Sequence, residues 1–506
     1  MQWRQSRTLV RNATTSASLH RPGNRGSTNG SPNGSLAYDS LVPSLMIQGV
    51  SSNAGKSLVV TALCRWLSRQ GVMVAPFKAQ NMSNNARVVD GGEIGTAQWL
   101  QALAAKTVPD VRMNPILLKP EGDTRSQVVL DGVVNHDLTN APWRGRSKKL
   151  WPHVSAAYDS LSDEYDVIVI EGAGSPAETN LWVDDIVNMA VADYADAPVA
   201  LVADIDRGGA FAHLYGTWAL LPPEWQRRVE GFLLNKFRGD ATLLDPAPRD
   251  LEALCGVATI GVIPWLEHAL PDEEGPTTSL ASTSGPQVSI VCGPYASNLD
   301  EFVALQQAAR VTWVRTRHEL SDSDLVIIPG SKNVARDLQW LRATGLDADL
   351  HEAALAGTPL LGICGGLQML GRRVLDPEGV EGEEEGLDLL ALETSYERNK
   401  RTTRSTIDFG DLGDSWAWLK DRHVSGYEIR HGVTRAASEI DVTDGHNVFG
   451  SRNVLGIYLH GLFEDPDVLR AFSGAGATGL ETTFELLADA IDDHVDGAWL
   501  RRRLGI

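Results

Sequence analysis

The stretch SLMIQGVSSNAGKS, residues 44–57, decides the fold of the first half of the chain. Its apolar start predicts a buried strand, and residues 57–70 place apolar side chains at helical spacing before Gly71. A turn ending in Gly-Lys-Ser between a strand and a helix is typical of a phosphate-binding loop, in which backbone N–H groups and the helix N-terminus bind phosphate oxygens. The spacing departs from the common G-x-x-x-x-G-K-S form, because the first glycine, Gly49, lies one position earlier. A plain glycine turn is the alternative to nucleotide binding.

The loop also predicts which side chains would hold ATP and Mg²⁺. Lys56 would offset phosphate charge, and the Ser57 hydroxyl would ligate magnesium. Glu171 ends the apolar run DVIVIE, where it could make a second magnesium contact or be purely structural. Asn235, after the run GFLL, could recognise the adenine base or face solvent. The expected nucleotide-binding positions are Gly49, Asn53, Ala54, Gly55, Lys56, Ser57 and Asn235.

Short apolar runs alternate with helical patterns along the rest of the chain. This alternation indicates α/β domains with parallel sheets, whose ligands bind at the carboxyl ends of the strands. Residues 270–287 are rich in Pro, Gly, Ser and Thr, and apolar runs begin again at VSIVC. We therefore expect one domain at 44–269, a linker at 270–287 and a second domain at 288–506.

The composition excludes several classes of protein. The 506-residue chain has 45 Lys and Arg against 65 Asp and Glu, a formal net charge of −20, which argues against a nucleic-acid binder. No apolar run approaches the roughly 18 residues that cross a bilayer. The four cysteines form no C-x-x-C pair, so neither a disulfide framework nor a zinc site is indicated, and a cytoplasmic location is expected.

Residues 1–43 differ from the rest of the chain. They carry five arginines and no acid before Asp39, and they are rich in Ser, Thr, Asn and Gly. This composition predicts a disordered basic tail. An organellar transit peptide and an over-long start assignment are the alternatives.

A second motif, TPLLGICGGLQMLG at 358–371, places Cys364 between an apolar strand and a helical pattern. A nucleophile at such an elbow is exposed, its flanking glycines relieve crowding, and the following helix N-terminus favours a thiolate. His460 ends another predicted strand, where it could act as the general base. Alone, each residue could be ordinary packing; together they predict nucleophilic catalysis. The expected oxyanion donors lie at Gly330 and at the backbone N–H of Gly365.

These two motifs in one chain indicate ATP-driven, glutamine-dependent amide formation. From about residue 45 to near its end, the chain resembles the adenosylcobyric acid synthases, the glutamine-hydrolysing amidotransferases of cobalamin biosynthesis. PFKAQNMS and ADIDRGG favour this family over the cobyrinic acid a,c-diamide synthases. The segments that carry the resemblance are IQGVSSNAGKS, PFKAQNMSNNARV, EIGTAQWLQA, MNPILLKP, SPAETNLW, DIVNMAVA, ADIDRGGAFA, LNKFRGD, IIPGSKN, GICGGLQMLG, GYEIRHG and YLHGLF.

The resemblance implies an α/β fold made of a P-loop domain like that of dethiobiotin synthetase and a flavodoxin-like class I glutamine amidotransferase domain. Cys364 would form a glutamyl thioester and release ammonia, with His460 moving the proton. The first domain would use MgATP to phosphorylate the b, d, e and g carboxylates of adenosylcobyrinic acid a,c-diamide, and ammonia would displace phosphate. Glutamine and the adenosylated corrinoid would be the partners, with no nucleic acid or membrane. The implied substrate or ATP contacts are Lys78, Gln80, Asn81, Asp204, Asp206 and Arg207.

Three departures from the family pattern qualify these expectations. Many class I glutaminases carry Glu two residues after the histidine, where this chain has Leu462. A Cys–His dyad is therefore expected rather than a triad, and Glu464 is the remaining candidate for an orienting acid. The tail before Pro43 has no family counterpart. The acidic run EGVEGEEEG at 378–386 reads as an extra, solvated surface loop.

The remaining alternatives come from related classes. The cobyrinic acid a,c-diamide synthases are the nearest enzymatic rival. A partitioning or regulatory ATPase with a deviant phosphate loop typically has a lysine where Ser51 stands, and it lacks a cysteine elbow. A free-standing glutaminase does not account for the first 270 residues.

Overall fold

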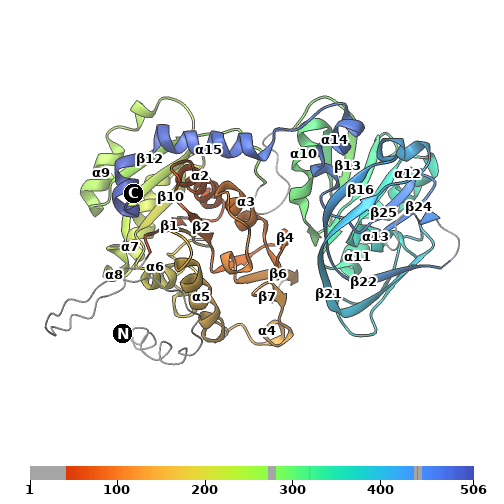
Figure 1. The fold of residues 1–506 in the computed structure, drawn as a ribbon, viewed down its shortest axis with the longest axis horizontal. Coiled ribbons are helices and arrows are strands. Elements are labelled where there is room, and N and C mark those ends of the chain that lie inside the picture. The colour runs from red at the N-terminus through yellow and green to blue at the C-terminus, as the bar shows by residue number, and fades with distance from the viewer. Residues whose placement is uncertain (1–41, 123, 272–280, 318–319, 438–440, 443–446) are drawn as a thin grey trace, which may run out of the picture. The chain divides into compact units, whose positions relative to one another are not determined.

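The computed structural model describes residues 42–122, 124–271, 281–317, 320–437, 441–442 and 447–506 (Figure 1). The predicted tail, up to residue 41, and much of the predicted linker lie outside the described residues. Within the described part of the chain, no helix has the length and apolar character that a membrane crossing needs.

A six-stranded parallel sheet forms the centre of the first domain, with β1 between β9 and β10. All six residues of β1 are buried, including the polar Ser44 and Gln48, as expected for a central strand of a parallel sheet that is covered on both faces. The strands, in sheet order, are β12 (Thr259–Pro264), β11 (Val229–Phe237), β10 (Val199–Asp204), β1 (Ser44–Gly49), β9 (Val167–Glu171) and β2 (Val74–Phe77). The expected parallel α/β architecture is confirmed.

Helices cover both faces of this sheet and build two apolar cores. One core contains side chains from α2 (Lys56–Arg69) and α3 (Thr96–Ala104), and the other contains side chains from α5, α6, α7 and α9. The latter are α5 (Ser147–Ser162), α6 (Met189–Ala195), α7 (Ala210–Leu220) and α9 (Ala247–Cys255). Two small sheets complete the domain: β3 (Gln80–Met82), β6 (Ile116–Gly122), β7 (Arg125–Leu130) and β8 (Val133–Val134), and the pair β4 (Ala86–Val89) and β5 (Gly92–Gly95).

The second domain is built on a seven-stranded sheet. Its first five strands are parallel and its last two antiparallel, as expected for a flavodoxin-like α/β domain. In sheet order they are β15 (Arg310–Val314), β13 (Gln287–Val291), β16 (Leu325–Ile328), β18 (Leu360–Ile363), β25 (Val454–Ile457), β24 (Val448–Ser451) and β23 (Asp441–Val442). Its helices include α10 (Val303–Ala308), α11 (Val334–Thr344), α12 (Leu346–Ala356), α13 (Gly365–Leu370) and α14 (Pro466–Ser473).

A long hairpin adds a second layer to this domain. It consists of β21 (Leu392–Asp408) and β22 (His423–Ala436), which pair antiparallel, with β19 (Arg373–Leu375) and β20 (Glu384–Glu385) beside them. The acidic run at 378–386 therefore contains a short strand. Its Glu381 also differs from the expected solvated loop, because the carboxylate forms an ion pair with Lys332 and its side chain is 9% exposed.

The last two helices return to the first domain. The α15 helix (Leu480–His494) and α16 (Gly497–Leu504) share one apolar core with α2, and Leu487 on α15 is fully buried there. The Asp496 amide donates to the Ile260 carbonyl at 2.7 Å, which fixes the chain beside β12. The expected second domain, 288–506, included these helices. An apolar helical stripe shows in sequence that a helix must be buried, but not which core it joins. By packing, the second domain is therefore an insertion between β12 and α15.

Candidate active sites

The predicted phosphate loop follows β1 directly, at the carboxyl edge of the first sheet. Gly55, the residue before α2, has φ of 101°. A Cβ at Gly55 would lie 2.0 Å from the Asn235 Nδ2 atom, so only glycine fits this turn. The Lys56 ammonium donates to the Ser51 carbonyl at 3.2 Å and to the Gly174 carbonyl at 3.4 Å. The lysine thus lies folded over the loop, where incoming phosphate oxygens would replace these carbonyls.

Glu171 and Ser57 meet beside the loop, as the sequence predicts. The Ser57 hydroxyl donates to the Glu171 Oε1 atom at 2.9 Å, and Glu171 is fully buried. Lys78, an expected substrate contact, instead forms an ion pair with the same oxygen at 2.6 Å. Among the described residues, no three His, Cys, Asp or Glu side chains are placed to hold a metal. A hydroxyl and one carboxylate still fit Mg²⁺, which commonly takes its other ligands from phosphates and water.

Asn235 and its neighbour brace the phosphate loop. The Asn235 amide donates to the Ala54 carbonyl, and the Lys236 ammonium donates to the Asn53 carbonyl, both at 3.0 Å. Lys236 also forms an ion pair with Asp204, the last residue of β10. The predicted recognition of adenine by Asn235 stays a prediction. The hydrogen bond to the loop is by itself enough to explain why this side chain is buried.

A cavity of about 350 Å³ opens at the phosphate loop, and only some of the residues expected to bind nucleotide or substrate line it. It is lined by the predicted residues Asn53, Gly55, Lys56, Ser57, Asn81, Arg207 and Asn235. Four expected substrate contacts are not in its lining: Lys78, Gln80, Asp204 and Asp206. Asp204 pairs with Lys236 and Arg207, and Asp206 pairs with Arg238.

Cys364 lies in the turn between β18 and α13 with φ of 53°, a left-handed conformation that is strained for a cysteine. The glycines around it are required by close packing: a Cβ at Gly366 would lie 1.9 Å from the Ile328 carbonyl oxygen. The local geometry is thus that of a nucleophile elbow, as the flanking glycines predict.

His460 reaches Cys364 and is held by a carboxylate. Its Nδ1 atom donates to Glu301 Oε1 at 2.8 Å, and Glu301 Oε2 accepts the Gly461 amide at 2.8 Å. The side chains of His460 and Glu301 are each only 1% exposed. Burial lowers the pKa of His460, but the Glu301 carboxylate and the Cys364 sulfur, which also hydrogen-bonds the ring, raise it to about 10. The ring of Tyr427 stacks on the imidazole at 5.2 Å.

This arrangement differs from the dyad expected from the sequence, because a third residue orients the histidine. Sequence reasoning missed Glu301, which precedes His460 by 159 residues. The other candidate, Glu464, points instead to Arg87, with 2.7 Å between its Oε2 atom and Nη1. The sequence feature that could have identified Glu301 is the acidic pair Asp300 and Glu301, which follows shortly after the first strand of the second domain.

The two expected oxyanion positions lie next to each other beside the cysteine. A Cβ at Gly365 would lie 2.5 Å from the Ser331 amide nitrogen, and one at Gly330 would lie 3.0 Å from the His460 ring. Gly330 and Ser331 form the short strand β17, which pairs with β14 (Ala296–Ser297). The backbones of Gly365 and Ser331 thus approach each other closely beside Cys364, and their role as oxyanion donors stays a prediction.

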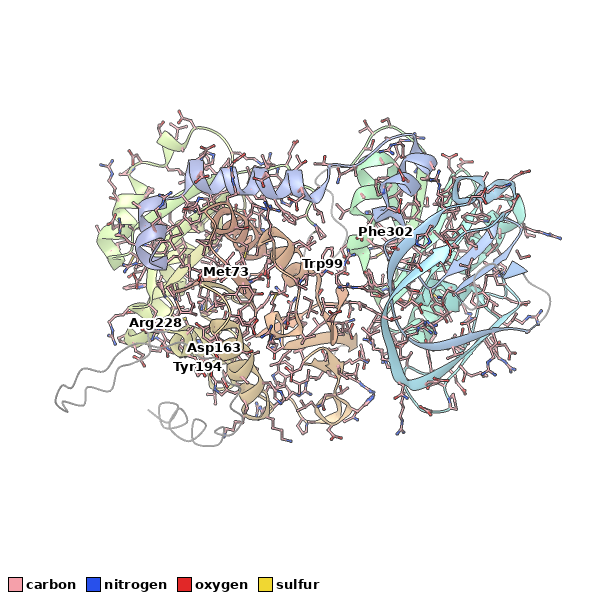
Figure 2. All side chains as sticks on the ribbon, in the orientation of Figure 1. Met73, Trp99, Asp163, Tyr194, Arg228 and Phe302 are labelled. Atoms are coloured by element: carbon pink, nitrogen blue, oxygen red, sulfur yellow. The ribbon has the colours of Figure 1, made fainter. Side chains whose placement is uncertain are left out.

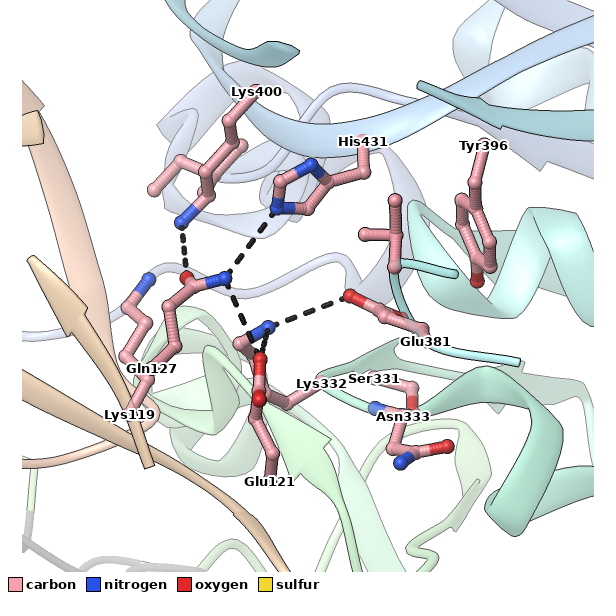
Figure 3. A network of polar contacts seen from close by, with 12 residues as sticks. Lys119, Glu121, Gln127, Ser331, Lys332, Asn333, Glu381, Tyr396, Lys400 and His431 are labelled. Carbon is pink, nitrogen blue, oxygen red and sulfur yellow. Dashed lines mark hydrogen bonds and ion pairs between the residues drawn. The ribbon is translucent and has the colours of Figure 1, made fainter. Parts of the chain in front are cut away.

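Residues of both domains line the small cavity at Cys364. Its volume is about 40 Å³, and its walls include Asn84, Lys119, Ser297, Asn298, Lys332, Glu381, Lys400 and His431. Figure 3 shows the polar network where the two domains meet beside this cavity. The Lys332 ammonium forms ion pairs with Glu121 of the first domain at 3.0 Å and with Glu381 of the second at 3.4 Å. Gln127 lies between Lys400 and His431. Burial, reinforced by the charges of Lys332 and Lys400, lowers the pKa of His431 to about 3, so its ring is neutral at physiological pH.

Arg87 of the first domain contacts both chain segments that hold the His460–Glu301 pair. Its Nε atom donates to Asp300 Oδ2 at 3.0 Å, and its Nη1 atom donates to Glu464. Asp300 precedes Glu301 in the chain, and Glu464 follows four residues after His460. The guanidinium lies 4.9 Å from the ring of Trp99, which Figure 2 labels. Sequence reasoning did not identify Arg87.

The fold and the two sites define a class of enzyme in which a nucleotide-binding α/β domain is joined to a glutamine amidotransferase domain. Family models agree: residues 45–276 match the CobQ/CobB/MinD/ParA nucleotide binding domain, and residues 287–468 match the CobB/CobQ-like glutamine amidotransferase domain. The chain belongs to the cobyric acid synthase family, whose members are glutamine-dependent amidating ligases of cobalamin biosynthesis. The family resemblance seen in the sequence is confirmed.

Two relatives show how far the likeness extends. The chain is 54% identical over 471 residues to cobyric acid synthase of Variovorax paradoxus (strain S110), covering 90% of this chain and 98% of that protein. It is 53% identical over 486 residues to cobyric acid synthase of Paracidovorax citrulli (strain AAC00-1), covering 91% and 98%.

Proposed function

We propose that this enzyme converts the b, d, e and g carboxylates of adenosylcobyrinic acid a,c-diamide into amides in the cytoplasm, using ATP and glutamine. The product is adenosylcobyric acid. The observation that carries the proposal is the Cys364–His460–Glu301 group in the same chain as a phosphate-loop cavity, in a protein 54% identical to a cobyric acid synthase.

In the second domain, His460 holds the proton of the Cys364 thiol as an imidazolium, because its pKa of about 10 lies above physiological pH, and the sulfur attacks the amide carbon of glutamine. The amides of Gly365 and Ser331 donate to the oxygen that becomes negative. His460 returns the proton to nitrogen as the C–N bond breaks, which releases ammonia and leaves a glutamyl thioester. Water then hydrolyses the thioester to glutamate. Glu301 holds the ring orientation through all of these steps.

In the first domain, a substrate carboxylate attacks the γ-phosphorus of ATP and forms an acyl phosphate and ADP. Ammonia then attacks the acyl carbon and expels phosphate, leaving the amide. ATP is needed because a carboxylate is a poor acyl donor, whereas phosphate is a good leaving group. The loop amides and Lys56 bind the ATP phosphates. Mg²⁺ held by Ser57 and Glu171 would supply further positive charge at the phosphates.

The substrate contacts divide into two groups. Asn81 and Arg207 line the cavity and are the better candidates for direct contact with the corrinoid or ATP. Lys78 and Asp204 are engaged with other side chains beside the loop and would act by supporting the loop and its metal site. Asp206 pairs with Arg238, and its role stays a prediction. Gln80, on β3, is half-buried, and its role stays a prediction.

The test is mass spectrometry of the purified enzyme's products with MgATP, glutamine and adenosylcobyrinic acid a,c-diamide. We expect four successive carboxylate-to-amide changes. Amidation of the undiamidated acid, with no change in the a,c-diamide, would instead assign the chain to the a,c-diamide synthases. Omitting ATP gives the matched control, in which glutamate release without amide formation is expected.

A further inference from the structure

Arg87 lies where the first domain meets the chain segment that carries Glu301. It is on β4, its side chain is only 6% exposed, and its guanidinium pairs with Asp300, whose side chain is fully buried. The Asp300 Oδ2 atom accepts from Arg87 Nε at 3.0 Å and from the Thr96 hydroxyl at 3.3 Å. Both donors belong to the first domain, so that domain holds Asp300 in place.

Asp300 and Glu301 are neighbours in the chain but face different partners. Both lie in the short 3₁₀ turn η5 (Leu299–Phe302). Glu301 accepts from the His460 ring and from the Gly461 amide, whereas Asp300 accepts from the first domain. Because consecutive Cα atoms are only about 3.8 Å apart, a shift of Asp300 also moves the backbone of Glu301.

A second contact between Arg87 and the imidazole is made through an aromatic ring. The guanidinium lies over the ring of Tyr427 at 5.2 Å, and the same ring stacks on the His460 imidazole at 5.2 Å, with 19° between the two planes. The His460 amide also donates to the Tyr427 carbonyl at 2.9 Å. A cation over an aromatic face is attracted by the negative charge of that face. Arg87 therefore supports His460 from two directions.

Arg87 also balances charge beside the imidazole. Asp300 and Glu301 are adjacent buried carboxylates, and like charges that are poorly screened from each other repel. The guanidinium offsets the charge of Asp300. Without it, an unpaired buried charge would remain next to Glu301, and the turn would have to shift to reach water. The pair with Glu464 contributes less, since that carboxylate is 37% exposed.

We propose that Arg87 is a positioning residue of the glutaminase site, supplied by the nucleotide-binding domain to hold Glu301 and His460 in place beside Cys364. The inference rests on the proposed function, in which His460 and Cys364 release ammonia from glutamine. The described residues that line the Cys364 cavity do not include Arg87, so it acts through its neighbours and not on glutamine.

The experiment measures glutamate release by the full chain with MgATP, the corrinoid and varied glutamine. We expect Arg87→Met to lower the glutaminase kcat about 10²-fold, the effect of a misplacement of about 1 Å, with the KM for glutamine within about twofold of wild type. Arg87→Lys keeps the charge but loses the planar guanidinium, so part of the loss should be recovered, to about tenfold below wild type. Arg112→Met is the matched control. Arg112 also forms two ion pairs, with Asp110 and Glu164 of its own domain, and its loss should change kcat by no more than about twofold.

A double-mutant cycle distinguishes positioning from a general clamp between the domains. If Arg87 acts through the histidine and its carboxylate, adding Arg87→Met to Glu301→Gln should lower kcat by less than about fivefold more. A further fall of the full 10²-fold would make Arg87 an independent clamp and overturn the proposal. A kcat of Arg87→Met within about threefold of wild type, or a change confined to KM, would overturn it as well.

Two further outcomes are kept apart from these. If circular dichroism shows that Arg87→Met does not fold, Arg87→Lys takes its place in the cycle, with the smaller fall expected for it. A wild-type enzyme that releases no glutamate from glutamine would refute the proposed function itself. Normal release by the wild type and by both Arg87 variants would refute only the positioning role.

Discussion

Replacing Glu301 by Gln tests the carboxylate that the sequence did not reveal. The variant keeps the size of the side chain and removes its charge, 2.8 Å from the His460 ring nitrogen. Burial alone would hold the pKa of His460 below its ordinary value of 6.5, yet Glu301 and Cys364 together raise it to about 10. The rise in the pKa of His460 from 6.5 to about 10 corresponds to roughly 5 kcal/mol in favour of the imidazolium. If most of it comes from Glu301, about 3–5 kcal/mol is lost, which predicts a roughly 10²- to 10⁴-fold fall in glutaminase kcat.

The assay is glutamate release from glutamine, with ammonium-driven amidation as the internal reference. Glu464→Gln is the matched control, since it removes a nearby charge without touching the imidazole; its loss should be much smaller. A Glu301→Gln enzyme within about threefold of wild type, or one less impaired than Glu464→Gln, would refute the assignment.

The same substitution has a pH signature in stability. The pKa of His460 in the folded protein, about 10, lies above its value of 6.5 in the unfolded chain. The stabilisation from the ion pair is therefore fully present below pH 6.5 and is lost as pH rises through about 10. Urea unfolding should show the largest difference between wild type and Glu301→Gln below pH 6.5, and the difference should shrink at higher pH. A difference that grows with pH contradicts the sign of this effect.

Three further changes probe the other parts of the enzyme. Cys364→Ala should reduce glutaminase activity to background and leave ammonium-driven amidation intact, as followed by product mass; loss of both would contradict two separate sites. Lys56→Ala should stop amidation with either nitrogen source. It should also weaken ATP binding by roughly 10-fold or more in calorimetry, because a positive charge facing the phosphates is lost. Unchanged affinity for ATP would contradict the assignment of residues 49–57 as a phosphate-binding loop. Leu487→Ala should lower the free energy of unfolding by about 2–5 kcal/mol, as large-to-small core changes do, and an unchanged urea midpoint would contradict the packing of α15.

The sequence predicted those parts of the sites that are continuous in the chain. The phosphate loop and the cysteine elbow each combine a strand, a turn and a helix within about 15 residues, so local spacing is enough to identify them. Glu171 was predictable because a carboxylate that ends a strand next to β1 must lie near the loop.

Residues that act across the fold were not predictable in the same way. Glu301 reaches His460 from a 3₁₀ turn, η5 (Leu299–Phe302), which no motif marks. Arg87 and Lys332 read as ordinary charged positions in sequence, and their partners come from the other domain. Asn235 was expected to recognise a base, yet its visible contact is with the loop backbone, because the sequence does not show how closely β11 approaches Gly55.

The return of α15 and α16 to the first sheet also sets the order in which the enzyme can be completed. Domains normally fold as they leave the ribosome, with earlier segments first. Here the first core needs Leu487 and Leu500, which are translated after the whole inserted domain. The apolar surface of α2 therefore stays uncovered while the glutaminase domain is being made. The glutaminase domain can therefore fold before the nucleotide-binding domain is complete. A chain break near residue 475 should impair the nucleotide-binding domain first, because it removes α15 and α16 from that domain's core.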